Sequence, residues 1–129
     1  MSTQEHVIVT GGSGLLGAML VHLLIEEEDV RPVVMDVNPD PKRLEDVKDR
    51  IEYVQGDVSD ADLLNKTFGK FKPISIYHLA VLPGDLCEKK PLEAVRINVN
   101  GFMNLLEAAR ANGVRQVLFS SSGTTTVRT

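Results

Sequence analysis

Four glycines stand close together near the start of the chain, in the stretch VIVTGGSGLLG at residues 7–17. Gly12, Gly14 and Gly17 have the spacing G-x-G-x-x-G, and Gly11, Gly14 and Gly17 have the related spacing G-x-x-G-x-x-G. Glycines between an apolar strand and a helix allow a tight turn, a close approach of the backbone to a pyrophosphate, and close packing of the helix on the strand. The first N–H groups of the helix then face the phosphates. The pattern predicts a dinucleotide site whose loop contacts the cofactor through Gly11, Gly14, Leu15, Leu16 and Gly17.

An acidic residue stands at the expected distance from this loop. Asp36 ends the apolar stretch PVVMD and lies 19 residues after Gly17. A carboxylate there accepts hydrogen bonds from the adenosine ribose hydroxyls and repels a 2′-phosphate, so the sequence favours NAD over NADP. Two alternatives stay open. Asp36 could simply begin a turn, and Lys42 and Arg43 are near enough in sequence to meet a 2′-phosphate.

The sequence lacks the motifs of several other classes of site. Ala18 and Met19 follow Gly17, where a Walker A loop needs Lys and Ser or Thr. The sequence holds no G-x-S-x-G nucleophile elbow, no kinase signature and no H-E-x-x-H zinc motif. We therefore expect no metal site.

Composition limits the partners and the cellular compartment that we expect for the protein. The 129 residues carry a net charge of −4 without a dense Lys/Arg cluster, which argues against a nucleic-acid partner. The apolar runs are far shorter than the roughly 20 residues of a membrane span. The first residues have no signal-peptide pattern, and the single cysteine, Cys87, fits a reducing compartment. We expect a cytoplasmic protein.

Five short apolar runs alternate with stretches of helical periodicity, at residues 6–10, 32–36, 51–55, 74–79 and 116–120. Most of these runs are nearly continuous in apolar residues, which is typical of strands buried on both faces of a parallel sheet. The alternation predicts a single α/β domain over residues 1–129, a doubly wound parallel sheet of the Rossmann type. The expected strand order is 3-2-1-4-5, with the cofactor crevice between the first and fourth strands.

The stretches between the runs contain candidate helices. Leu16, Leu20, Leu23 and Leu24 form the expected apolar face of the first helix, and Leu63, Leu64 and Phe68 that of a later helix capped by Ser59 or Asp60. Residues 91–112 predict the longest helix, which Gly113 ends. Its apolar stripe contains Leu92, Val95, Val99, Met103, Leu106 and Ala109. The polar residues 39–49 predict an irregular loop.

Five stretches in order carry a resemblance: TGGSGLLG, GDVSD at 56–60, HLA at 78–80, NVNGFMNLLEAAR at 98–110 and VLFSSS at 117–122. Together they resemble the extended short-chain dehydrogenase/reductase family, the NAD-dependent epimerases and dehydratases. KPLE at 90–93 followed by NVNG is most similar to the UDP-glucose 4-epimerase type.

The resemblance implies roles for particular residues. Asp57 and Val58 would line the adenine, Leu79 and Ala80 would pass under the ribose and pyrophosphate, and Asn98 would lie near the active site. Ser122 would be the catalytic Ser/Thr. Simpler readings remain open for three of them: Asp57 as a helix cap, Asn98 as a partner of backbone groups at a helix irregularity, and Ser122 as part of a turn.

The family's reaction needs a Tyr followed four residues later by a Lys. Tyr53 is followed at that spacing by Asp57 and Tyr77 by Val81, so neither fits. We therefore expect the chain to be the N-terminal part of a longer NAD-dependent enzyme, homodimeric when complete, that transfers hydride on a nucleotide sugar or polyol. We expect this part alone to be inactive, and to self-associate through its last strand or its longest helix. A non-catalytic dinucleotide-binding module is the alternative.

Overall fold

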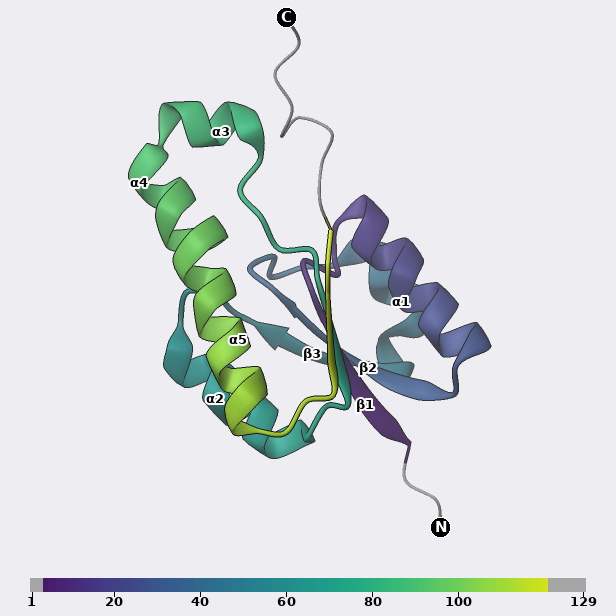
Figure 1. Cartoon of the computed structure of the whole chain (residues 1–129). Helices are drawn as coiled ribbons and strands as arrows, with labels where there is room; N and C mark the ends of the chain where they lie inside the picture. The colour runs from purple at the N-terminus through teal and green to yellow at the C-terminus, as the bar shows by residue number, and fades with distance from the viewer. Residues whose placement is uncertain (1–3, 121–129) are drawn as a thin grey trace, which may run out of the picture.

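The computed structural model describes residues 4–120 and has a five-stranded parallel sheet at its centre (Figure 1). The strand order is β3-β2-β1-β4-β5. All four neighbouring pairs are parallel, which confirms the predicted topology. The strands are β1 (Glu5–Thr10), β2 (Val30–Asp36), β3 (Glu52–Gln55), β4 (Ser75–His78) and β5 (Gln116–Phe119).

Helices cover both faces of the sheet, so the molecule has three layers (Figure 1). On one face lie α1 (Leu15–Glu27) and a 3₁₀ helix, η1 (Lys42–Arg50). On the other lie α2 (Ala61–Phe71) and α5 (Gly101–Ala111), which contact each other. Each face has its own buried cluster, because the side chains of each strand alternate between the two faces.

The buried face of α1 differs from the predicted one. Leu24 is buried as expected, but Leu16 and Leu23 are exposed. The helix instead buries Ala18, Val21 and Ile25 against Val7, Val9 and Val34 of the sheet. Because α1 is apolar around most of its circumference, periodicity alone could not identify the side that faces the sheet.

The opposite face matches the prediction more closely. Leu64 and Phe68 of α2 are fully buried beside Ile8 and Ile76. Asp60 caps α2 by accepting a hydrogen bond from the Leu63 N–H at 3.0 Å, so Asp60, rather than Ser59 or Asp57, is the cap.

The prediction of an irregular loop over residues 39–49 is wrong. Lys42–Arg50 forms η1, and its two apolar side chains, Leu44 and Val47, are buried against the α1 side of the sheet. Two buried side chains suffice to order a segment whose other seven residues are all charged.

The longest predicted helix is present but changes character along its length. It begins as α4 (Pro91–Ala94), continues as a π-helical segment, η2 (Val95–Asn100), and ends as α5. A short helix, α3 (Gly84–Lys89), precedes it and was missed. Gly113, at φ +67°, follows the helix as predicted. In the apolar stripe Ala109 is buried, whereas Leu92, Val95, Val99 and Met103 are exposed.

β5 forms one edge of the described sheet, as expected, and Leu118 and Phe119 are exposed there. Self-association through this edge stays a prediction. Within residues 4–120, none of the helices has the length and apolar character needed to cross a bilayer.

Candidate functional site

A cavity of about 370 Å³ opens at the carboxyl ends of the strands. Segments at the ends of four different strands meet there: the glycine loop after β1, Asp36 and Val37 at the end of β2, Gly56–Val58 after β3, and Leu79–Leu82 after β4. Helices leave β1 and β4 toward opposite faces of the sheet, and a crevice at that point is where open α/β sheets bind ligands.

Gly11 can only be glycine in this arrangement. Its φ of +69° is unfavourable for other residues, and its N–H donates to the Met35 carbonyl oxygen at 2.8 Å. A Cβ on Gly11 would lie 2.9 Å from the backbone nitrogen of Ala80. The glycine therefore lets the loop after β1 lie directly against the segment after β4, and both line the cavity.

Gly17 is buried in the first turn of α1 and lies outside the cavity lining. A Cβ there would run into the carbonyl oxygen of Gly11 and would lie 2.6 Å from the Cα of Gly12. Its role in the structure is thus close packing of the helix on the loop, one of the roles that the glycine spacing predicts.

The N-terminus of α1 has no anionic group of its own. Its N-cap, Gly14, makes no side-chain hydrogen bond, and the first turn contains no acidic residue. The leading N–H groups of a helix lack partners within it and carry a partial positive charge. The loop therefore offers donors to an anion in the cavity.

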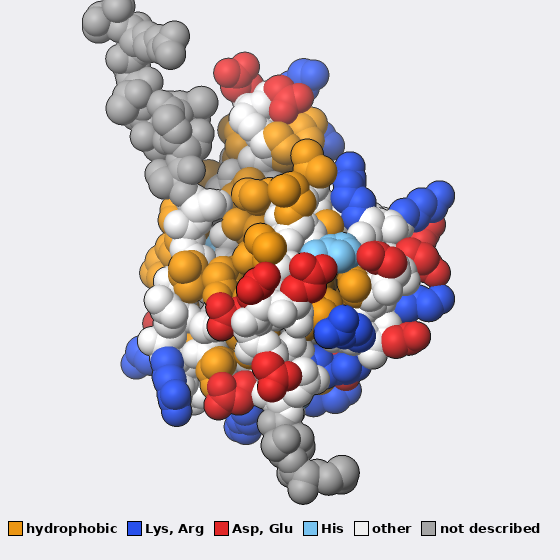
Figure 2. Space-filling model, turned by 90° about the vertical axis from the view of Figure 1, so that its right-hand side faces the viewer, with side chains coloured by type: hydrophobic (Ala, Val, Ile, Leu, Met, Phe, Trp, Pro, Cys, Tyr) orange, Lys and Arg blue, Asp and Glu red, His pale blue; other side chains and the backbone are white. Residues whose placement is uncertain are grey.

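Leu15 and Leu16, at 68% and 63% exposure, lie outside the lining of this cavity. With Met19 and Leu23 they form an apolar surface along α1, on the face of the molecule that Figure 2 shows. Leu15 also borders a separate depression, which Arg43 lines from η1. The assignment of both leucines as cofactor contacts stays a prediction.

Asp36 stands at the cavity and is oriented by the glycine loop. Its Oδ2 accepts hydrogen bonds from the Ser13 N–H at 3.0 Å and the Ser13 hydroxyl at 2.6 Å. Its Oδ1 accepts from the Asn38 N–H at 3.3 Å, so Asp36 also begins a turn. The turn and a ribose contact are compatible, because each carboxylate oxygen can accept more than one hydrogen bond. Ser13 was not predicted from the sequence, because it occupies an unspecified position (x) of the glycine motif.

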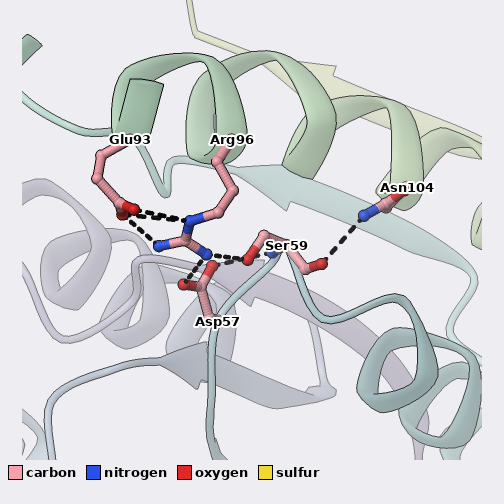
Figure 3. A network of polar contacts seen from close by, with 5 residues as sticks. All are labelled: Asp57, Ser59, Glu93, Arg96 and Asn104. Atoms are coloured by element: carbon pink, nitrogen blue, oxygen red, sulfur yellow. Dashed lines mark hydrogen bonds and ion pairs between the residues drawn. The ribbon is translucent and has the colours of Figure 1, made fainter. Parts of the chain in front are cut away.

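Asp57 is the second carboxylate in the lining. Its Oδ1 accepts from the Ser59 N–H at 2.9 Å, and its Oδ2 pairs with the Arg96 guanidinium at 2.9 Å (Figure 3). Burial by itself raises the pKa of Asp57, but the hydrogen bonds from Ser59 and Arg96 outweigh burial and hold the pKa below its ordinary value. The neighbouring Val58 is buried and also lines the cavity.

A buried hydrogen-bond chain fixes the segment after β4. The Thr10 Oγ accepts from the Leu79 N–H at 3.0 Å and the Ala80 N–H at 3.1 Å. Its own hydrogen is then free to donate to Nδ1 of His78, which lies 2.7 Å away. This assigns the His78 proton to Nε2, an atom that is buried without a hydrogen-bond partner among residues 4–120.

His78 is therefore expected to stay neutral well below pH 6. Burial lowers its pKa from 6.5 to about 4. In the unfolded chain the imidazole takes up a proton near pH 6.5. The contribution of His78 to the free energy of unfolding is therefore complete above that pH and falls as pH drops toward 4, by up to about 1.4 kcal/mol per pH unit.

An NMR titration of the imidazoles checks this expectation. His22 is the internal control, because the Ala18 carbonyl and the Asp46 carboxylate raise its pKa above 6.5. If His78 titrates together with His22, the His78 imidazole is not buried as the structure has it.

Asn98 lies in the π-helical segment and does not line the cavity. Its side chain accepts from the Leu82 N–H at 2.7 Å and donates to the Leu82 carbonyl at 3.2 Å. It thus holds the loop that borders the cavity, in keeping with the alternative reading of Asn98 as a partner of backbone groups. Ser122 lies outside the described residues.

Known proteins of one family resemble the chain in sequence and in structure. The model of the NAD dependent epimerase/dehydratase family matches residues 7–126. Human UDP-glucose 4-epimerase is 33% identical over 93% of the chain. The NAD complex of Thermus thermophilus UDP-glucose 4-epimerase has a TM-score of 0.82 at 30% identity over 92% of the chain. The Thermotoga maritima UDP-glucose 4-epimerase with UDP-glucose has a TM-score of 0.83 at 27% identity over 92%.

These relatives are much longer than the chain. It spans 38% of the human enzyme and 38% of each of the two bacterial structures.

Proposed function

The chain belongs to the NAD-dependent epimerase/dehydratase family, and from this membership we propose that it forms the NAD-binding region of an enzyme that acts on a nucleotide sugar. The observation that carries the proposal is a single cavity shared by the donors of the glycine loop and the Asp36 carboxylate. These are the two groups that the ADP half of a dinucleotide needs at its adjoining pyrophosphate and ribose: donors for the pyrophosphate and an acceptor for the ribose hydroxyls.

The residues around the cavity fit the parts of NAD. Gly11 and Gly14, at the N-terminus of α1, would hold the pyrophosphate, because phosphate charge is favourable there. Asp36 would accept hydrogen bonds from the adenosine ribose hydroxyls. Asp57 and Val58, which line the same cavity, would hold the adenine, and Leu79 and Ala80 would support the ribose and pyrophosphate.

NAD supplies hydride transfer when bound, and this chain supplies binding and orientation. Tyr53 and Tyr77 lie in β3 and β4 without a Lys four residues later, and Tyr53 donates its hydroxyl hydrogen to the Asn38 carbonyl. Neither tyrosine therefore forms the Tyr-x-x-x-Lys pair, and the proposal assigns that pair to another part of the complete protein. Ser122 is its proposed Ser/Thr partner.

The relatives support the proposed substrate class. Human UDP-glucose 4-epimerase is similar to the chain in sequence, and the Thermotoga maritima structure contains UDP-glucose. We extend the proposal to a nucleotide sugar as substrate, to a homodimer as the state of the complete protein, and to the cytoplasm as its location.

Calorimetric titration of the chain with NAD and with NADP tests the proposed cofactor. We expect one NAD per chain and weaker binding of NADP, because the Asp36 carboxylate repels a 2′-phosphate. Absence of NAD binding to the folded chain would contradict the proposed function. A tenfold preference for NADP would instead contradict the assigned role of Asp36 and point to Lys42 or Arg43.

A further inference from the structure

Arg96 joins the long helix to the loop after β3. From η2 its guanidinium reaches Glu93 on one side and both Asp57 and Ser59 on the other (Figure 3). Only Asp57 of these four residues lines the cavity. Arg96 therefore contacts the cavity's carboxylate from behind, at the oxygen that the Ser59 N–H does not hold.

The consequence is a carboxylate fixed at both oxygens. Oδ1 is held by the Ser59 N–H at 2.9 Å and Oδ2 by Arg96 at 2.9 Å, so the carboxylate plane cannot rotate without losing one of these bonds. The Asn104 side chain donates to the Ser59 carbonyl at 3.2 Å and ties the same loop to α5. The remaining lone pairs of Asp57 are acceptors only.

A fixed acceptor beside a flat base distinguishes bases by the group at the base edge. An exocyclic amino group donates to it, whereas a carbonyl oxygen at the same position meets it acceptor to acceptor. A carboxylate free to rotate could move away from the carbonyl, and the distinction would weaken.

We propose that Arg96 is a positioning residue that makes the dinucleotide site selective for an amino-bearing base, by holding Asp57 in one orientation. The inference rests on the proposed function, because it needs the adenine of NAD beside Asp57. Glu93 completes the arrangement: it binds the opposite side of the guanidinium and limits the positions that Arg96 can take.

The test compares NAD with nicotinamide hypoxanthine dinucleotide, which carries a carbonyl in place of the adenine amino group. The measured quantity is the ratio of the two dissociation constants, for the wild-type chain, Arg96→Met and Arg96→Lys. Arg110→Met is the matched control, because Arg110 forms the same kind of i,i+3 pair with Glu107 on α5 but has no contact with Asp57.

We expect wild type and Arg110→Met to favour NAD by about tenfold, the worth of one hydrogen bond to a charged group. Arg96→Met should bind NAD about five- to tenfold more weakly, with less than a twofold change for the hypoxanthine analogue. The ratio for Arg96→Lys should lie between the ratios of wild type and Arg96→Met, because lysine keeps the charge but lacks the planar guanidinium that binds Glu93 and Asp57 together.

Three results are decisive. An equal loss for both dinucleotides in Arg96→Met, or an unchanged ratio, would overturn the inference, since a merely structural role moves both constants alike. Should Arg96→Met fail to fold, an unchanged ratio in folded Arg96→Lys overturns it as well, and a reduced ratio supports it. A folded wild-type chain that binds neither dinucleotide would instead remove the proposed function on which the inference rests.

Discussion

Replacing Gly17 with alanine is expected to lower the free energy of unfolding by about 2–4 kcal/mol. The added methyl group would meet the Gly11 carbonyl oxygen and the Gly12 Cα, which are backbone atoms and cannot turn away as a flexible side chain does. Relief requires α1 to move off the loop, which would open the buried contacts of Ala18 and Val21. Urea denaturation followed by circular dichroism measures the change.

Gly69 is the matched control for this substitution. It also lies in a helix, α2, but its Cβ would meet nothing within 4 Å. Gly69→Ala should raise stability by about 0.5–1 kcal/mol, because alanine loses less backbone entropy on folding. A Gly17→Ala chain as stable as wild type would mean that α1 does not approach the loop as closely as described.

Asp36→Ala is expected to weaken NAD binding by about 1–3 kcal/mol, through the loss of a charged acceptor for the ribose hydroxyls. NADP binding should fall less or improve, because the same change removes the repulsion of a 2′-phosphate. The preference between the two cofactors, measured by calorimetry, should therefore shift toward NADP. Equal losses for both cofactors would contradict a ribose contact and leave Asp36 only its bonds to Ser13 and Asn38.

Two further variants separate the role of the Asp36 carboxylate from the roles of neighbouring residues. Ser13→Ala removes the hydroxyl that orients Asp36 but keeps the carboxylate, so NAD should weaken while the preference over NADP persists. Asp40→Ala removes an exposed acidic residue that pairs with Lys42 at 3.9 Å, and it should leave NAD affinity within about twofold of wild type, as expected for an exposed pair.

The topology of the sheet could be predicted because its signals are local. Each strand contains a short run of apolar residues, and the glycines and Asp36 mark the crossover after β1 and the end of β2. The cap at Asp60 and the turn at Gly113 were readable for the same reason, since each depends on residues within one helical turn.

Features that depend on distant residues could not be predicted. The pair between Asp57 and Arg96 spans 39 positions, and the bond from Ser13 to Asp36 spans 23. Neither pair has a spacing that distinguishes it from other charged or polar residues. η1 was missed because its order comes from burying Leu44 and Val47 under α1 and the sheet, which the polar composition of residues 39–49 conceals.

The most direct test of the central claim is an NMR titration of the ¹⁵N-labelled chain with NAD. We predict saturable shifts of the amides of Gly11, Ser13, Gly14, Val37 and Ala80, which surround the cavity. The amides of Lys72 and Gly113, which precede β4 and β5 at the opposite ends of the strands, should not move. A folded chain whose cavity amides stay unchanged at millimolar NAD, or whose shifts gather around Lys72 and Gly113, would contradict the proposal that this cavity binds the dinucleotide.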